Sequence, residues 1–228
     1  MIAIGALCWN EAWATKQWIE STRRNSVGHD IKILAIDNGS EDKNKTWTEV
    51  LKADWFERTS SNENLSIGYN KLFRKSLELG ADIICLANND IIVGPMWLDA
   101  IVRELGKDSK RYLMPNEYLK RADFVDEDAL EYMRTAAAPT TTKMLKGTCL
   151  FFTPEAVREF LPIPEELVLW YCDSWIHGRL KKAGFSCEMV SDSLIYHYGS
   201  LSFYRRDDYT DIVAKDREVY NKLTGENL

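Results

Sequence analysis

Short apolar runs alternate with amphipathic segments along the first half of the chain. Three of the apolar runs have the length of strands, residues 2–8, 31–36 and 83–87, and residues 55–58 (WFER) form a weaker strand pattern. Three segments between them place apolar side chains at helical spacing: residues 11–24, 46–52 and 66–79. Strands and helices that alternate at these intervals indicate βαβ units. The pattern therefore predicts an α/β fold with a mostly parallel sheet.

The second half of the chain is less regular. Residues 116–143 carry mixed charge and end in alanine, proline and threonine, which is typical of a surface excursion or loop. A helix is expected to begin at Pro154, because proline fits the first turn of a helix, and another is expected over residues 173–183. Two short strands are expected to complete the core: residues 186–190 and 194–197. The polar residues 207–228 predict a surface helix.

Composition narrows the class of protein. Hydrophobic residues make up 45% of the chain and charged residues 28%, which fits a soluble protein with a substantial core. No repeat or linker divides the sequence, so a single domain is expected over residues 1–228. The formal net charge of -6 provides no broad basic surface for nucleic acid, so DNA is not favoured as a partner. A local patch for DNA would have to use a few basic residues: Lys107, Lys110, Arg111, Lys120 and Arg121.

The cysteines and the apolar runs indicate the cellular compartment of the protein. The five cysteines are scattered and form no CxxC pair, which is typical of reduced thiols in a cytoplasmic protein. The apolar run at residues 2–8 lacks a basic lead and a cleavage pattern, so it predicts a buried strand and not a signal peptide. No run approaches the roughly 20 apolar residues that a membrane span needs. We therefore expect a cytoplasmic protein without a membrane span.

Polar side chains cluster where three of the predicted strands end. They are contributed by three short stretches of the chain: Asn10 with Glu11, Asp37 with Asn38, and Asn88, Asn89 and Asp90. In open α/β sheets, ligands bind beyond the carboxyl ends of the strands. The sequence therefore predicts a binding site at this edge of the sheet.

Asp90 and His197 are the candidate metal ligands. A carboxylate after a buried strand can hold Mg²⁺ or Mn²⁺ together with phosphate oxygens and water. The alternative for Asp90 is a cap on the next turn. His197 closes the last predicted strand, where it is either a metal ligand or a hydrogen-bonded structural residue.

Other candidate residues also have a structural and a functional interpretation. Asp173 begins a helical pattern, as a general base or as an N-cap. Asp37 precedes Asn-Gly-Ser, and it either accepts a hydrogen bond from a nucleobase or begins an ordinary turn. Arg205 and Arg206 either close over phosphates or lie on a solvated surface.

Taken in order, six segments resemble motifs of the inverting, GT-A-fold nucleotide-sugar glycosyltransferases of the family 2 type. The first three are residues 36–42 (IDNGSED, like VDNGSTD), 64–70 (NLSIGYN, like N-x-G…N) and 86–91 (LANNDI, like the LNND form of the DXD motif). The others are residues 146–151 (KGTCLF, like G-x-C-L), 171–179 (YCDSWIHGR, like YEDVDLCLR) and 195–200 (IYHYGS, like H-x-G). Residues 183–185 (AGF) also match the family's AGY, and the resemblance covers roughly residues 1–200.

The resemblance implies a Rossmann-like, mostly parallel mixed sheet flanked by helices. It implies a nucleotide-binding half over residues 1–105, an acceptor and catalytic half over 106–204 and a tail over 205–228. It also implies sugar transfer with inversion from a nucleotide-sugar donor, with UDP as the commonest nucleotide of the family.

The resemblance assigns roles to individual residues as well. Asp173 would be the catalytic base, and Asp90 and His197 would hold Mn²⁺ or Mg²⁺. The donor would be bound by a larger set: Asn10, Asp37, Asn38, Asn64, Asn70, Asn88, Asn89, Gly147, Arg205 and Arg206.

The chain departs from the family pattern at several positions. Ser66 stands where Gly is common, Cys172 replaces the usual Glu of the ED pair, and Trp175 replaces the second Asp. Asp173 is then the acid left for the role of base. The loss of the Glu at Cys172 leaves open an inactive sugar-nucleotide-binding module.

A nucleotidyltransferase is the other alternative. Its chemistry favours a Gly-rich, basic loop after the first strand, and residues 8–13 (CWNEAW) contain neither Gly nor Lys. The acceptor is left open among a saccharide, a protein, a small molecule and a modified nucleobase.

Overall fold

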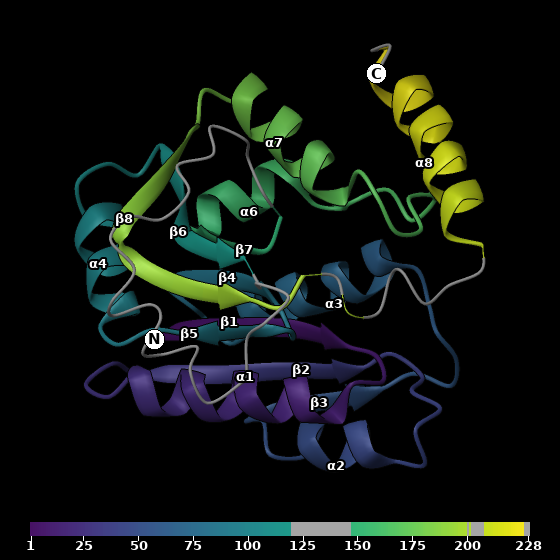
Figure 1. Ribbon diagram of the computed structural model, residues 1–228. Helices are drawn as coiled ribbons and strands as arrows, with labels where there is room; N and C mark the ends of the chain where they lie inside the picture. The colour runs from purple at the N-terminus through teal and green to yellow at the C-terminus, as the bar shows by residue number, and fades with distance from the viewer. Residues whose placement is uncertain (120–146, 200, 202–207, 226–228) are drawn as a thin grey trace.

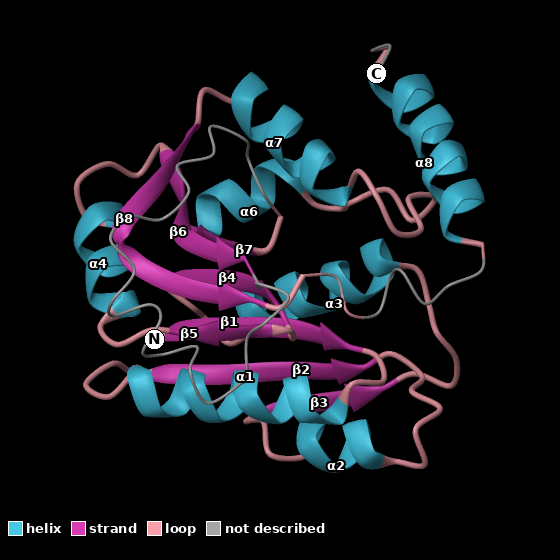
Figure 2. Cartoon of the chain, viewed as in Figure 1, coloured by secondary structure: helices cyan, strands magenta, loops and turns pink. Residues whose placement is uncertain are grey.

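The computed structural model describes residues 1–119, 147–199, 201 and 208–225. Within them the chain forms one mixed eight-stranded sheet with helices on both faces (Figures 1 and 2). The strands are β1 Ile2–Cys8, β2 Ile31–Asp37, β3 Trp55–Arg58, β4 Ile83–Asn88, β5 Ile91–Val93, β6 Arg111–Leu119, β7 Cys149–Phe152 and β8 Ser186–His197. The helices are α1 Ala12–Asn25, α2 Lys45–Val50, α3 Leu65–Glu78, α4 Trp97–Leu105, α6 Pro154–Phe160, α7 Cys172–Lys182 and α8 Tyr209–Thr224.

The first half of the chain forms a parallel sheet with the order β3-β2-β1-β4. Strand β1 pairs with β2 on one side and with β4 on the other, so the strand order reverses beside β1. The register places Cys8 opposite Asp37 and Leu7 opposite Asn88. The carboxyl ends of β1, β2 and β4 are therefore level, which confirms the convergence expected from the sequence.

The second half extends this sheet with strands of mixed direction. Strand β7 is antiparallel to both β4 and β6, β6 is parallel to β8, and β8 is antiparallel to β5. The last pairing places Ile91 opposite His197. The hydrogen-bonded register of β5 and β8 thus sets Asp90, the residue before Ile91, beside His197.

Two expectations for the second half were wrong. Residues 116–119 belong to strand β6 and not to a surface loop, while residues 120–143 of the same segment lie outside the described part. The two short strands expected at 186–190 and 194–197 are one strand, β8. Its pairing with β6 shifts register between Pro115 and Asn116, so residues 191–193 are skipped there. A strand can continue through such a bulge although the apolar alternation is interrupted.

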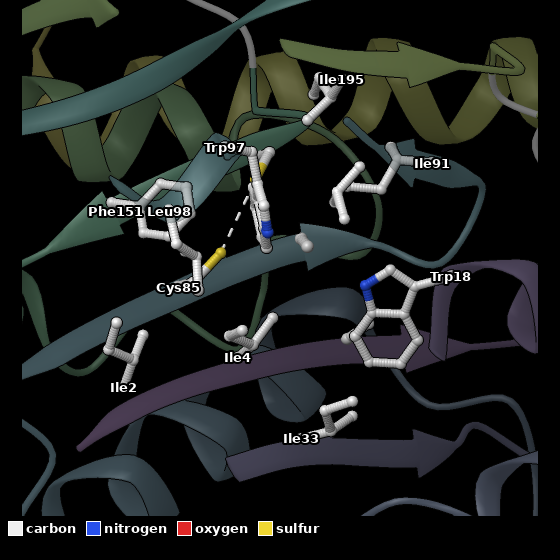
Figure 3. Close-up of a cluster of buried hydrophobic side chains, with 14 of the residues drawn as sticks. Ile2, Ile4, Trp18, Ile33, Cys85, Ile91, Trp97, Leu98, Phe151 and Ile195 are labelled. Carbon is white, nitrogen blue, oxygen red and sulfur yellow. Dashed lines mark hydrogen bonds between the residues drawn. The ribbon is translucent and has the colours of Figure 1, made fainter. Parts of the chain in front are cut away.

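Two apolar clusters, one on each face of the sheet, hold the helices in place. Trp18 of α1 and Trp97 of α4 are fully buried on one face with residues of β1, β2 and β4 (Figure 3). The sulfur atoms of Cys85 and Cys149 lie 3.6 Å apart in this cluster, and both are free thiols. The opposite face packs α3, α6 and α7 around Phe73 and Phe152. Burial of such side chains removes large apolar areas from water and fixes the sheet that positions the strand ends.

The described helices can be compared with the expectation that the chain has no membrane span. None of those in residues 1–119, 147–199 and 208–225 combines the length and the apolar character needed to cross a bilayer.

Candidate active site at the strand ends

The loop after β1 is fastened to the loop after β2 through Asn10. The Asn10 backbone N–H donates to Ser40 Oγ (2.8 Å), and its side-chain oxygen accepts from the Glu41 N–H (2.9 Å). The Thr46 hydroxyl donates to the Asn10 carbonyl (2.7 Å). Asn10 has φ 52°, a left-handed conformation that asparagine tolerates better than most residues. The two loops therefore form one connected edge.

Hollows open on both sides of this edge. One of about 580 Å³ lies between the β1 and β2 loops and is lined by Asn10, Glu11, Ala12, Trp13, Glu41, Asp42 and Lys45. The other, about 530 Å³, lies between the β2 and β3 loops and is lined by residues 39–41 and 58–62. Each is large enough for a nucleoside-sized ligand.

Trp13 connects the first hollow to strand β8. Its indole is 38% exposed, and its N–H donates to Glu11 Oε2 (2.7 Å). The ring meets Tyr198 edge-on, with centroids 4.9 Å apart. Tyr198 directly follows His197, so Trp13 connects the lining of the hollow with the chain segment that carries this candidate metal ligand. Trp13 was not predicted as a site residue, although a tryptophan three positions after a strand-end asparagine was a usable signal.

Asp37 is fully buried at the end of β2. Its Oδ1 accepts the Ser40 N–H (3.0 Å), so the turn interpretation is correct. Its Oδ2 lies 3.1 Å from Nε of Arg58 as an ion pair, and no described residue donates an aligned hydrogen bond to it. A buried carboxylate oxygen retains capacity for another donor, so the turn does not exclude the predicted contact with a nucleobase.

Three other predicted donor-binding asparagines make structural hydrogen bonds. The Asn38 amide bonds to Asn62 and Glu63 in the β3–α3 loop. The Asn64 side chain donates to the Glu165 carbonyl (2.8 Å), and Asn70 exchanges two hydrogen bonds of 2.8 Å with the backbone of Ile163. Asn70 could reach a ligand only by breaking these bonds, because it is 1% exposed.

Asn88 and Asn89 lie at the end of β4. The Asn88 N–H donates to the Thr148 carbonyl (2.8 Å), which leaves its half-buried side chain at the edge of the sheet. The Asn89 amide is buried and donates to the Thr15 hydroxyl (3.0 Å). Asn88 is therefore better placed for a ligand than Asn89.

Asp90, His197 and Glu117 form a buried chain of ionisable groups. His197 Nε2 lies 3.2 Å from Asp90 Oδ1, and its Nδ1 lies 2.9 Å from Glu117 Oε1. Each of the three residues is at most 7% exposed. Burial disfavours the charged imidazolium, but the contacts with Asp90 and Glu117 outweigh it and raise the pKa of His197 to about 9. The two carboxylates thus stabilise positive charge at this position.

The donor chemistry of this pair fits a divalent cation. No described residue gives His197 Nε2 an aligned hydrogen-bond partner, although this buried nitrogen faces the Asp90 carboxylate. A metal-binding histidine commonly has its other ring nitrogen held by a carboxylate, as Glu117 holds Nδ1 here. An imidazole and a carboxylate suit Mn²⁺ better than Mg²⁺, which prefers oxygen ligands alone. Among the described residues, no three Asp, Glu, His or Cys side chains are arranged so that all of them could hold one metal ion.

Glu117 was missed because of its place in the sequence. It lies within residues 116–143, whose mixed charge predicted a loop, and the structure instead puts it in strand β6. The apolar and aromatic residues of the segment 112–118 (YLMPNEY) were a signal for a strand, although Pro115 weakened it.

Asp173 lies in the first turn of α7 and is not its N-cap, which is Tyr171. The Asp173 Oδ1 accepts the N–H of Ser174 (2.8 Å). Gly147 packs directly against it, because a Cβ at Gly147 would lie 2.9 Å from both Cβ and Oδ2 of Asp173. The structure therefore brings together the two residues that the sequence assigned to separate motifs.

The pKa of the Tyr69 hydroxyl responds to both Asp173 and Asp90. Burial, and then the nearby Cys172, Asp173 and Asp90, raise the pKa of the Tyr69 hydroxyl. Packing gives a direct link between the two strand ends, because Gly147 contacts Asp173 and the neighbouring Thr148 accepts the Asn88 N–H.

The predictions that remain concern Arg205, Arg206 and the basic patch. Arg205 and Arg206 lie outside the described residues, as do Lys120 and Arg121 of the basic patch. The other three patch residues are each paired with acids: Lys107 with Glu104, Lys110 with Glu155, and Arg111 with Glu188.

Comparison with known proteins supports the fold. No family profile and no curated protein matches the sequence. Among solved structures, GalNAc-T7 with UDP, GalNAc and Mn²⁺ superposes with a TM-score of 0.62 and 14% identity, over 94% of this chain and 47% of that one. S. aureus TarS 1–349 superposes with a TM-score of 0.62 and 11% identity, over 98% of this chain and 72% of that one. Its complex with UDP gives 0.64 and 10%, over 99% and 72%.

The chain thus spans about half the length of the GalNAc-T7 chain that it matches. The strand order, the level strand ends and these superpositions lead to one conclusion: the chain has the GT-A fold of glycosyltransferases.

Proposed function

We propose that the protein is a glycosyltransferase that moves a sugar from a UDP-sugar to an acceptor hydroxyl with inversion. The observation that carries the proposal is the buried Asp90–His197 pair, backed by Glu117, at the end of β4 in a GT-A fold. Asp173 adjoins the same strand end, because Gly147 packs against it and the neighbouring Thr148 accepts the Asn88 N–H. The two similar proteins solved with UDP support the choice of nucleotide.

Donor binding would use the edge formed by β1, β2 and β4. The nucleoside would enter the hollow lined by Asn10 and Trp13. Asp37 is buried behind this edge, so its Oδ2 would accept an N–H of the base only after the β2 loop opens. Asn88 would contact the ribose, and Asp90 and His197 would hold a divalent cation. When bound, that cation acts as a Lewis acid that neutralises charge on the departing diphosphate.

Asp173 would perform the proton transfer. As the acceptor oxygen forms its bond to the anomeric carbon, the bond from that carbon to the diphosphate oxygen breaks. The acceptor proton passes to the Asp173 carboxylate, and the nucleoside diphosphate leaves with the bonding electron pair. A single in-line displacement of this kind inverts the anomeric centre. It needs one carboxylate base, in accordance with the single acid in residues 171–175 (YCDSW).

The test combines binding and turnover. A panel of nucleotide sugars is screened with Mn²⁺ for thermal stabilisation, because a ligand that binds the folded state raises the melting temperature by mass action. The stabilising donor is then incubated with acceptors, and release of UDP is measured. UDP release that requires Asp173 supports the proposal. Pyrophosphate release from nucleoside triphosphate and sugar phosphate would instead indicate a nucleotidyltransferase, and donor binding without turnover would indicate a binding module.

A further inference from the structure

The chain between α6 and α7 leads directly to Asp173 and is fixed from one side by α3. The Leu65 N–H donates to the Val168 carbonyl (2.7 Å). The side chains of Asn64, which precedes α3, and Asn70, within α3, donate hydrogen bonds to the carbonyls of Glu165 and Ile163. This side of the segment is therefore anchored to the nucleotide-binding half of the fold.

The other side is held by α8 through one carboxylate. Asp216 is fully buried, and it accepts three consecutive backbone N–H groups. Its Oδ1 lies 3.1 Å from the Val168 nitrogen, and its Oδ2 lies 2.8 Å from those of Leu169 and Trp170. Charge-assisted hydrogen bonds of this kind are stronger than neutral ones. They also pair backbone N–H groups that lie outside any helix or strand. An amide in place of the carboxylate has one acceptor oxygen and cannot reproduce them.

Tyr220, one helical turn after Asp216, extends this attachment to α7. Its ring stacks on Tyr171 with centroids 5.2 Å apart, and its hydroxyl lies 3.5 Å from the Ser174 carbonyl. Tyr171 has φ 64°, a conformation that a non-glycine residue holds only when its surroundings impose it. Asp173 lies between these two contact points.

We infer that α8 positions the catalytic base: Asp216 and Tyr220 clamp residues 168–174 and so fix the direction of the Asp173 carboxylate. This inference rests on the proposed role of Asp173. It changes the interpretation of the polar C-terminal segment, which the sequence predicted as a surface helix. In Figure 1, α8 stands clear of the sheet and lies beside the chain that enters α7, which agrees with these contacts.

A clamp of this kind affects turnover more than donor binding. The proposed donor ligands Asn10, Asp37 and Asn88 lie at or just beyond the carboxyl ends of β1, β2 and β4, and the described contacts of Asp216 do not include them. Misplacement of a catalytic group by about 1 Å can reduce the rate by about a hundredfold. Loss of the clamp should therefore lower kcat and leave the affinity for UDP unchanged.

The experiment compares Asp216→Asn with Asp211→Asn, an exposed aspartate on the same helix. Three quantities are measured: the Kd for UDP with Mn²⁺, the kcat for hydrolysis or transfer of a UDP-sugar, and hydrogen exchange of the amides at 168–170. In Asp216→Asn we expect a fall in kcat of at least tenfold, a Kd within twofold and faster exchange at 168–170. Asp211→Asn should match the wild type.

Failure of this inference can be told from failure of the proposed function. Unchanged exchange at 168–170 in Asp216→Asn, or an unchanged kcat in a protein whose Asp173→Asn variant is inactive, would overturn the clamp and leave the function standing. Near-normal turnover in Asp173→Asn would overturn the assigned base. If Asp216→Asn fails to fold, Tyr220→Phe and Tyr220→Leu replace it, and they must show the same lowered kcat with unchanged UDP affinity.

Discussion

Glu117 Oε1 lies 2.9 Å from Nδ1 of His197, inside the sheet and with both side chains buried. This contact fixes the orientation of the imidazole and directs Nε2 at Asp90. Through this contact the strand-end histidine becomes part of the proposed cation site.

Glu117→Gln should weaken the binding of Mn²⁺. A carboxylate behind a metal-binding histidine commonly contributes between tenfold and a hundredfold in affinity, so we expect about a tenfold rise in the Kd for Mn²⁺ with UDP present. Electron paramagnetic resonance of free Mn²⁺ measures this directly. Glu188→Gln, which alters a partly exposed glutamate paired with Arg111, is the matched control. Equal Mn²⁺ affinity in the two variants would remove Glu117 from the site.

Asp90→Ala should abolish metal-dependent donor binding. In the wild type, UDP with Mn²⁺ at a hundred times its Kd should stabilise the fold by about 2.7 kcal/mol, which appears as a higher melting temperature. The variant should show no such shift at the same concentrations. A full shift in the variant would mean that UDP binds without this carboxylate.

Asp173→Asn should eliminate sugar transfer while UDP binds with a Kd within about twofold, because an amide cannot accept the acceptor proton. Steady-state kinetics and a UDP titration on the same preparation check both parts. Asp192→Asn, an exposed aspartate on β8, serves as the control.

Gly147→Ala should lower turnover, whereas Gly178→Ala should raise the stability of the fold. The first places a methyl group 2.9 Å from the Asp173 carboxylate and must displace it, so kcat should fall. The second adds a methyl group within helix α7 at an ordinary 3.6 Å from Tyr220, and it should stabilise the fold by about 0.5–1 kcal/mol. Kinetics and thermal unfolding of the two variants test the pair. Unaltered kcat in Gly147→Ala would show that Asp173 tolerates the shift.

Asn70→Ala tests whether this asparagine serves the fold or the donor. It removes two buried hydrogen bonds to Ile163 and leaves backbone groups unpaired, which should cost about 2 kcal/mol of unfolding free energy. The Kd for UDP should stay within about twofold. Denaturant unfolding and UDP titration separate the roles, and a weakened Kd with full stability would restore the donor-binding assignment.

The parallel half of the fold could be predicted because three of its four strands, β1, β2 and β4, are largely apolar runs. The run at 31–36 and the Asp37 that follows it correspond to β2 and its end. Side-chain identity alone could not show that Asn38, Asn64 and Asn70 bond to backbone groups, because those partners are distant in sequence.

The second half was harder to predict because its pairings are long-range. Glu117 joins the site through the pairing of β6 with β8, which no local pattern reveals. The burial of Asp216 was also hidden, since a helix with mostly polar residues gives no sign that one carboxylate faces inward. Asp173 was proposed as the base because the residues around it resemble a motif, and its contact with Gly147 required the structure.

The bulge in β8 has a consequence for variation among sequences. His197 faces Asp90 because its register is set locally, by Ile91 on one side and Leu119 on the other. A one-residue deletion between 194 and 197 would turn the imidazole to the opposite face of the sheet and put a tyrosine in its place. Residues 191–193 are skipped in the ladder with β6, and Ser191 and Asp192 are exposed, so they can absorb a change of length. Insertions and deletions in related chains should therefore accumulate at 191–193 and be excluded from 194–197.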